Sequence, residues 1–142
     1  MAHMIETPNK LLQAHECEAL VITCMDFRFV AATYAFIRDE LHIPTFDLFA
    51  IPGAAKGIAE KNQYVLHVPT LAKALHRIGS IILVNHERCG AYGISDPKQE
   101  LEAHNRDLRK AKSILQNVFP DTPVQLFFAQ IGDREVTYLA VE

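Results

Sequence analysis

The hydrophobic and polar positions along the chain follow two periods, one typical of buried strands and one typical of helices. Short, nearly continuous apolar runs such as "ALVIT" and "IILV" favour buried strands. Longer segments with apolar residues at three- and four-residue spacing favour amphipathic helices. Strands are expected over 19–24, 45–51 and 79–86, and helices over 10–20, 30–41, 68–78 and 96–119. This alternation of strands and helices is typical of an α/β domain with a mainly parallel sheet flanked by helices.

The C-terminal part of the chain has a different pattern. Two apolar segments, 122–130 and 134–142, are separated by Gly132 and Asp133, which favours an antiparallel hairpin that closes the sheet. With 142 residues, the chain is expected to form one domain over 1–142. Its first four residues, "MAHM", resemble a cloning remnant and are excluded from the expected fold.

Reactive side chains follow three of the expected strands. Cys24 ends the first strand, Gly53 follows the second, and His86 and Cys89 follow the third. The carboxyl ends of parallel strands meet at one edge of a sheet, where such domains place their functional residues. The sequence therefore predicts that these residues converge at one edge.

Cys24, His86 and Cys89 together supply two sulfur atoms and one nitrogen. Thiolate and imidazole are the ligands that zinc prefers, and three protein ligands leave the fourth tetrahedral position open, as in catalytic sites. Two thiolates neutralise the charge of the metal, so a nearby hydrogen-bond acceptor is needed to orient a zinc-bound hydroxide. We therefore expect one zinc ion per chain at these three residues.

The segment "TCMDFRF" supplies such an acceptor in Asp26. If the segment is extended, alternate side chains project to one side, so Asp26 and Arg28 reach the same site as Cys24. Arg28 can hold the Asp26 carboxylate by a bidentate pair. Asp26 then either accepts a hydrogen bond at the site or, when released, occupies the open position on the metal. A purely structural ion pair is the alternative.

In these two motifs, C-x-D-x-R and H-x-x-C-G, the chain resembles the β-class carbonic anhydrases. The resemblance implies Cys24, His86 and Cys89 as zinc ligands, with Asp26 and Arg28 as catalytic residues. It also implies a mainly parallel sheet and a homodimer or larger homo-oligomer. The segment "FAIPGAAKG" matches the family's substrate loop loosely, which makes Gly53 and Ala54 substrate-proximal candidates.

The activity implied by this resemblance is the reversible hydration of CO₂ to bicarbonate and a proton through zinc-bound hydroxide. Two alternatives stay open. The same zinc design could hydrolyse carbonyl sulfide or carbon disulfide, or the chain could be a zinc-stabilised oligomeric or regulatory module without turnover. The sequence differs from the family at Phe27, Asn85 and Ile51, near the substrate but outside the metal set.

Composition narrows the setting further. A net charge of −3 gives no broad attraction to nucleic acid or to an anionic membrane, and no apolar run approaches the ~20 residues of a membrane span. Three cysteines do not suggest a disulfide framework and fit a reducing cytoplasmic location. Cys17 has only His15 as a nearby ligand type, so it is interpreted as a structural or unengaged thiol. His76 has no matching ligand set.

Overall fold

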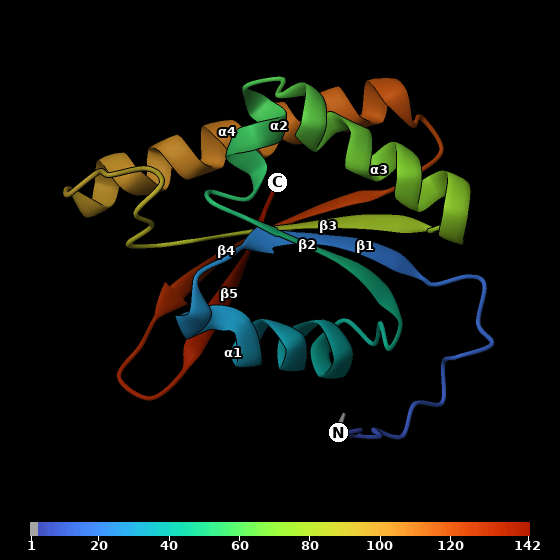
Figure 1. Ribbon diagram of the computed structural model, residues 1–142. Helices are drawn as coiled ribbons and strands as arrows, with labels where there is room; N and C mark the ends of the chain where they lie inside the picture. Colours follow the sequence, from blue (N-terminus) through green and yellow to red (C-terminus); the bar gives the residue numbers. More distant parts are fainter. Residues whose placement is uncertain (1–2) are drawn as a thin grey trace.

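The computed structural model describes residues 3–142 and shows one mixed five-stranded sheet between two layers of helices (Figure 1). The strands occur in the order β2-β1-β3-β4-β5. They comprise β1 (Ala19–Cys24), β2 (Phe46–Ile51), β3 (Ser80–His86), β4 (Val124–Ile131) and β5 (Val136–Val141). The first four are parallel and β5 pairs antiparallel with β4, so the expected fold class is confirmed.

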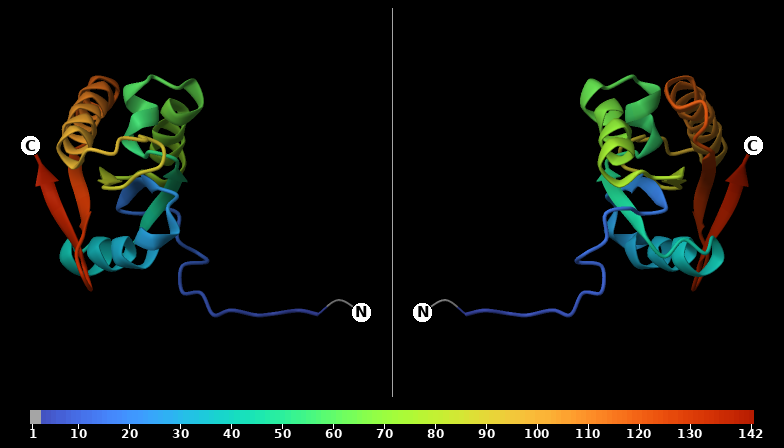
Figure 2. Two further views of the ribbon diagram at one scale, coloured as in Figure 1. Left: turned by 90° about the vertical axis from the view of Figure 1, so that its left-hand side faces the viewer. Right: turned by 90° about the vertical axis from the view of Figure 1, so that its right-hand side faces the viewer.

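The helices lie on both faces of the sheet (Figures 1 and 2). One face carries α2 (Ala55–Ala59), α3 (Gln63–His76) and α4 (Pro97–Val118), and the other carries α1 (Val30–Ala35). The helix α1 follows a 3₁₀ turn, Phe27–Phe29, and continues into a π-helical turn, Phe36–Glu40. None of the helices in the described part of the chain is long and apolar enough to cross a membrane.

The sheet is buried on both faces because its central strands are apolar at nearly every position. In β1, Leu20 and Ile22 pack with α3 and α4, while Ala19 and Val21 pack with the layer that contains α1. Strands that bury both faces read as continuous apolar runs, which explains why β1 and β3 are recognisable in the sequence.

The helix expected over 10–20 does not form. Residues 10–13 make only a turn, in which the Asn9 side chain accepts a hydrogen bond from the Leu11 amide at 2.8 Å, and β1 then begins at Ala19. Leu11 and Leu12 are more than half exposed, so the segment has no buried face. Short helices without such packing are marginal in water.

The helix expected over 68–78 begins five residues earlier, at Gln63. Asn62 caps it, because its side chain accepts a hydrogen bond from the Val65 amide at 3.2 Å. Pro69 therefore lies inside the helix, not near its start, and α3 ends at His76 because Arg77 adopts a left-handed conformation, with φ of 52°. This ending places His76 beside the first residues of the sheet strands.

Candidate metal centre

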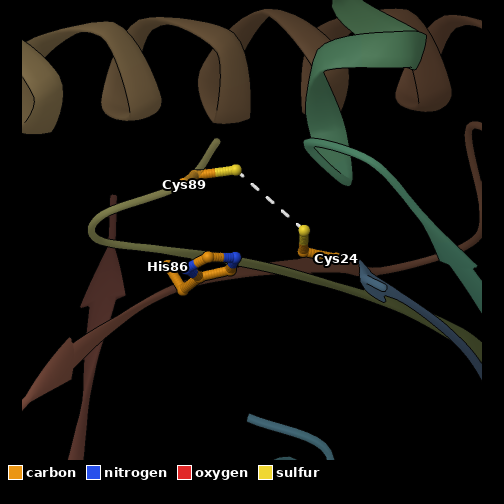
Figure 3. Close-up of side chains that lie close together, drawn as sticks. All are labelled: Cys24, His86 and Cys89. Carbon is orange, nitrogen blue, oxygen red and sulfur yellow. Dashed lines mark hydrogen bonds between the residues drawn. The ribbon is translucent and has the colours of Figure 1, made fainter. Parts of the chain in front are cut away.

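The carboxyl ends of β1 and β3 bring Cys24, His86 and Cys89 together in a buried group (Figure 3). Cys24 and His86 are the last residues of their strands, and Cys89 lies in the loop that follows β3. The two sulfur atoms lie 4.0 Å apart. All three side chains are at least 93% buried, so the predicted convergence is observed.

The imidazole of His86 is oriented with one nitrogen facing the two cysteines. Its Nδ1 donates a hydrogen bond to the Glu87 carbonyl at 2.7 Å, whereas Nε2 is buried and has no hydrogen-bond partner among residues 3–142. Phe29 stacks on the ring with centroids 4.2 Å apart, which holds it in place. A carbonyl bond on one nitrogen leaves the other as an acceptor, the arrangement of metal-bound histidines.

The two thiols compete for one negative charge. Hydrogen bonding to Cys89 lowers the pKa of Cys24, while the same contact raises the pKa of Cys89. Two thiolates 4.0 Å apart in a buried place cannot both be ionised without a positive charge between them. Together with the unpartnered Nε2 of His86, this donor set fits a soft or borderline divalent cation such as zinc.

Asp26 and Arg28 lie beside this group and pair with each other. Arg28 Nε lies 3.0 and 3.2 Å from the two Asp26 oxygens, and Arg28 Nη2 lies 2.7 Å from Oδ2. Asp26 Oδ2 is 3.8 Å from His86 Nε2. The hydrogen bonds from Arg28 lower the pKa of Asp26 to about 2, so the carboxylate stays charged at neutral pH. The expected bidentate pair is confirmed.

The local conformation that produces the pair differs from the extended segment expected from alternation. Asp26 caps a 3₁₀ turn that contains Arg28, and its carboxylate also accepts a hydrogen bond from the Arg28 amide at 3.0 Å. The turn therefore folds Arg28 back onto Asp26. Phe27, between them, points outward and is 86% exposed.

The segment after β2 lies against the same group. Ala54 is fully buried and clusters with Cys24 and Cys89. Gly53 and Ala54 both have positive φ, at 76° and 46°. A left-handed conformation is unfavourable for a residue with a side chain, and such outliers occur where the surrounding structure requires a sharp change of direction. Here the change brings residues 53 and 54 close to Cys24.

Sequence reasoning missed Glu100, which fixes the loop that carries Cys89. This buried carboxylate on α4 accepts hydrogen bonds from the amides of Arg88 and Cys89, at 2.7 and 3.0 Å. Arg88 has φ of 54°, and its carbonyl accepts a hydrogen bond from Arg28 at 3.0 Å. The peptide groups of the loop are therefore held from both sides.

Asn85 and His104 form a second buried connection between β3 and the helices. The Asn85 side chain accepts a hydrogen bond from the Ala55 amide at 3.1 Å and donates to His104 Nδ1 at 2.9 Å and to Tyr92 at 3.1 Å. Burial lowers the pKa of His104 to about 4, so the ring is neutral and is packed within the core. The sequence signal for these buried contacts is the presence of polar residues, including Glu100 and His104, on the apolar stripe of α4.

Comparison with known proteins agrees with this geometry. A family model described as "Putative carbonic anhydrase" matches residues 14–137. An uncharacterized protein of Rickettsia bellii is 29% identical over 125 residues, which cover 80% of this chain and 76% of that protein. One of Rickettsia conorii is 29% identical over 136 residues, covering 87% and 73%.

Solved structures show the same fold. A β-carbonic anhydrase of Trichomonas vaginalis superposes with a TM-score of 0.63 at 14% identity, covering 95% of this chain and 88% of that one. One of two tetrameric β-carbonic anhydrases of Sordaria macrospora superposes with a TM-score of 0.63 at 17% identity, covering 92% and 84%. At these identities the likeness concerns the fold alone.

The role of Glu100 can be tested through stability. We expect Glu100→Ala to lower the free energy of unfolding by roughly 3 kcal/mol, because it leaves two buried amides without an acceptor. Glu102→Ala, at an exposed position of the same helix, should change it by less than about 0.5 kcal/mol. Urea denaturation monitored by circular dichroism measures both, and equal effects of the two substitutions would contradict the assigned role.

Proposed function

This chain belongs to the carbonic anhydrase family whose model it matches, and we propose that it catalyses the reversible hydration of CO₂ to bicarbonate with one zinc ion at Cys24, His86 and Cys89. The observation that carries the proposal is the buried group of two thiols and an unpartnered imidazole nitrogen, with a charged carboxylate 3.8 Å from that nitrogen. Zinc bound there supplies a Lewis acid that lowers the pKa of a coordinated water.

The proposed task of Asp26 is to accept a hydrogen bond from the reacting water and so orient it. The carboxylate suits this task because its pKa of about 2 keeps it ionised. Arg28 holds it by the bidentate pair and thereby keeps it from turning toward the metal ligands. Neither residue is needed for a purely structural metal, so their presence beside the group favours an enzyme.

The surroundings also suit a small linear molecule. An apolar cavity of about 90 Å³ lies between β1, β2 and α1, and Cys24, Thr23 and Met25 are among the residues that line it. CO₂ carries no net charge and forms only weak hydrogen bonds, so an apolar cavity that includes a metal ligand is a suitable place for it to approach. We propose Gly53 and Ala54 as the backbone wall of the substrate site on the opposite side of Cys24.

Metal content and activity measured together test the proposal. We expect about one zinc per chain after a mild chelator wash, and CO₂ hydration by stopped-flow. Cys89→Ser should lose most of the zinc, the activity and part of the stability, because metal binding is coupled to folding. Cys17→Ser, at a cysteine outside the group, should keep the zinc and the activity.

Each other outcome has a defined meaning. Hydrolysis of carbonyl sulfide without CO₂ hydration would replace the proposed substrate and keep the zinc design. Stoichiometric zinc with neither activity would support a non-catalytic module. Zinc retained in Cys89→Ser would contradict the ligand assignment itself.

The Asp26–Arg28 pair makes a separate prediction. Arg28→Ala should keep its zinc but lose activity by about 100-fold or more, because the freed Asp26 carboxylate can occupy the open position. The activity of Arg28→Lys should lie between those of the wild type and Arg28→Ala, since a lysine keeps the charge without the bidentate geometry. Arg38→Ala removes a comparable exposed pair, with Asp39, and serves as the control.

Wild-type activity should also rise with pH between about 6.5 and 9, near the titration of a zinc-activated water. Asp26 cannot cause this rise because its pKa is about 2. Stopped-flow rates and zinc content across this range provide the measurement.

For the Asp26–Arg28 pair, wild-type activity in Arg28→Ala would show that the pair is structural only.

We also propose that the chain assembles as a homodimer or a larger homo-oligomer. Five exposed apolar side chains lie on the turn after β1, on α1 and on the edge strand β2: Met25, Phe27, Val30, Tyr34 and Leu48. Apolar side chains gathered in this way are typical of protein interfaces. The structurally similar Sordaria macrospora enzymes are described as tetrameric, which favours a second copy as the partner.

Sedimentation velocity at micromolar concentration tests the assembly. We expect the wild-type chain to sediment as a dimer or larger species, and Phe27→Arg to shift it toward the monomer, because burial of a charged side chain is costly. Leu75→Arg changes a similarly exposed residue on α3 and should leave the assembly unchanged. A monomeric wild-type chain would refute the proposal.

A further inference from the structure

A second group of metal-binding side chains lies at the opposite edge of the sheet. Cys17 precedes β1, Asp47 is the second residue of β2, and His76 is the last residue of α3. Their potential ligand atoms all lie within 4.8 Å of one another. Since β1 and β2 begin at Ala19 and Phe46, this group is at the amino ends of the strands, away from the Cys24 group at their carboxyl ends.

The backbone fixes the relative positions of these three residues. The Cys17 amide donates to the carbonyl of His76 at 3.1 Å, which ties the segment before β1 to the end of α3. The next amide, of Glu18, donates to the Thr45 carbonyl at 3.0 Å, beside the start of β2. The three side chains therefore meet because main-chain hydrogen bonds clamp their segments together.

The side chains themselves carry the charges that a divalent cation needs. His76 Nδ1 lies 2.8 Å from both carboxylate oxygens of Asp47. The Cys17 side chain is partly buried, and both burial and the charge of Asp47 raise the pKa of its thiol. A thiolate and a carboxylate together would carry two negative charges, equal to the charge of one divalent ion.

Two simpler interpretations account for less of the arrangement. An Asp47–His76 ion pair explains those two residues. It leaves the Cys17 thiol with a 3.5 Å hydrogen bond to the Ala19 carbonyl, which does not account for the position of the thiol beside the pair. A cysteine nucleophile activated by a histidine and an aspartate would need a lowered thiol pKa, and here the pKa of Cys17 is raised. A metal ion uses all three groups at once, because it favours the deprotonated thiol.

We propose that Cys17, Asp47 and His76 form a second metal site that binds a divalent transition-metal ion, with zinc the best fit to one sulfur, one nitrogen and one oxygen ligand. A cavity of about 180 Å³ adjoins the site, and His15 is among its lining residues, so either a water or this imidazole can complete the shell.

This second site should bind more weakly than the Cys24 group. Asp47 and His76 are 28% and 47% exposed, and a carboxylate replaces one thiolate. The bound ion links the segment before β1, the start of β2 and the end of α3, so it should stabilise the fold by mass action. Because binding displaces the thiol proton, affinity should increase with pH.

Cobalt titration of the 142-residue chain, with the Cys24 group already loaded with zinc, tests the proposal. We expect one additional equivalent of cobalt to bind, with the thiolate-to-cobalt absorption in the near ultraviolet. Cys17→Ser should abolish that absorption, and His76→Gln should weaken binding at least about tenfold. His67→Gln, which changes an exposed histidine on the same helix, should have no effect.

Alkylation of Cys17 by iodoacetamide provides a readout that does not depend on cobalt spectra. Excess zinc should protect this partly exposed thiol in the wild-type chain and in His67→Gln, but not in His76→Gln or Asp47→Asn. If Cys17→Ser does not fold, these two variants still test the site. Absence of a second equivalent, or its persistence in both Cys17→Ser and His76→Gln, would overturn the proposal and leave the proposed activity unaffected.

Discussion

The closeness of two buried thiols, with sulfur atoms 4.0 Å apart, is the constraint on which the rest of this structure depends. Without a cation the pair can carry one negative charge at most, and the Nε2 atom of His86 beside it has no partner among the described residues. Burying such groups is costly unless they are paired. A group built at this cost, with its imidazole held by a carbonyl bond and by the Phe29 ring, is organised for a metal ion.

The free-energy cost of this arrangement is offset by residues on distant elements of the chain. The loop that presents Cys89 contains Arg88 in a left-handed conformation, which is unfavourable by roughly 1–3 kcal/mol. Glu100, on α4, offsets this cost because its carboxylate accepts hydrogen bonds from the amides of Arg88 and Cys89. The helix α4 therefore acts both as a covering layer of the sheet and as the support of a ligand.

Much of the fold and of this site could be predicted from the sequence because both depend on strands that bury two faces. Their apolar runs identify β1 and β3, and the ends of parallel strands must meet, so Cys24 and His86 could be placed together. The 3₁₀ turn at Asp26 could not be foreseen, because the pairing with Arg28 looks the same in the sequence whether the segment is extended or turned.

Residues that act through backbone groups were harder to find. Glu100 accepts hydrogen bonds from backbone amides, which every residue has, so its place on the apolar stripe of α4 signals that it is buried but not which groups it contacts. The Cys17, Asp47 and His76 group has no local motif either, since about thirty residues separate its members and main-chain hydrogen bonds bring them together. Such a cluster can be identified only when the strand register is known, because the register determines which segment ends lie next to one another in space.

The contacts of Arg28 show how the two motifs of the family depend on each other. Its guanidinium binds the Asp26 carboxylate and also donates to the carbonyl of Arg88, the residue before Cys89. A displacement of the Cys89 loop therefore changes the geometry of the carboxylate, and a displacement of Asp26 changes the support of the loop. Asp26 and Cys89 reach the same centre from segments that follow different strands. Because Arg28 donates to both segments, it sets the distance between the Asp26 carboxylate and Cys89. The C-x-D-x-R motif is thus part of the scaffold that holds the second cysteine as well as the neighbour of the first.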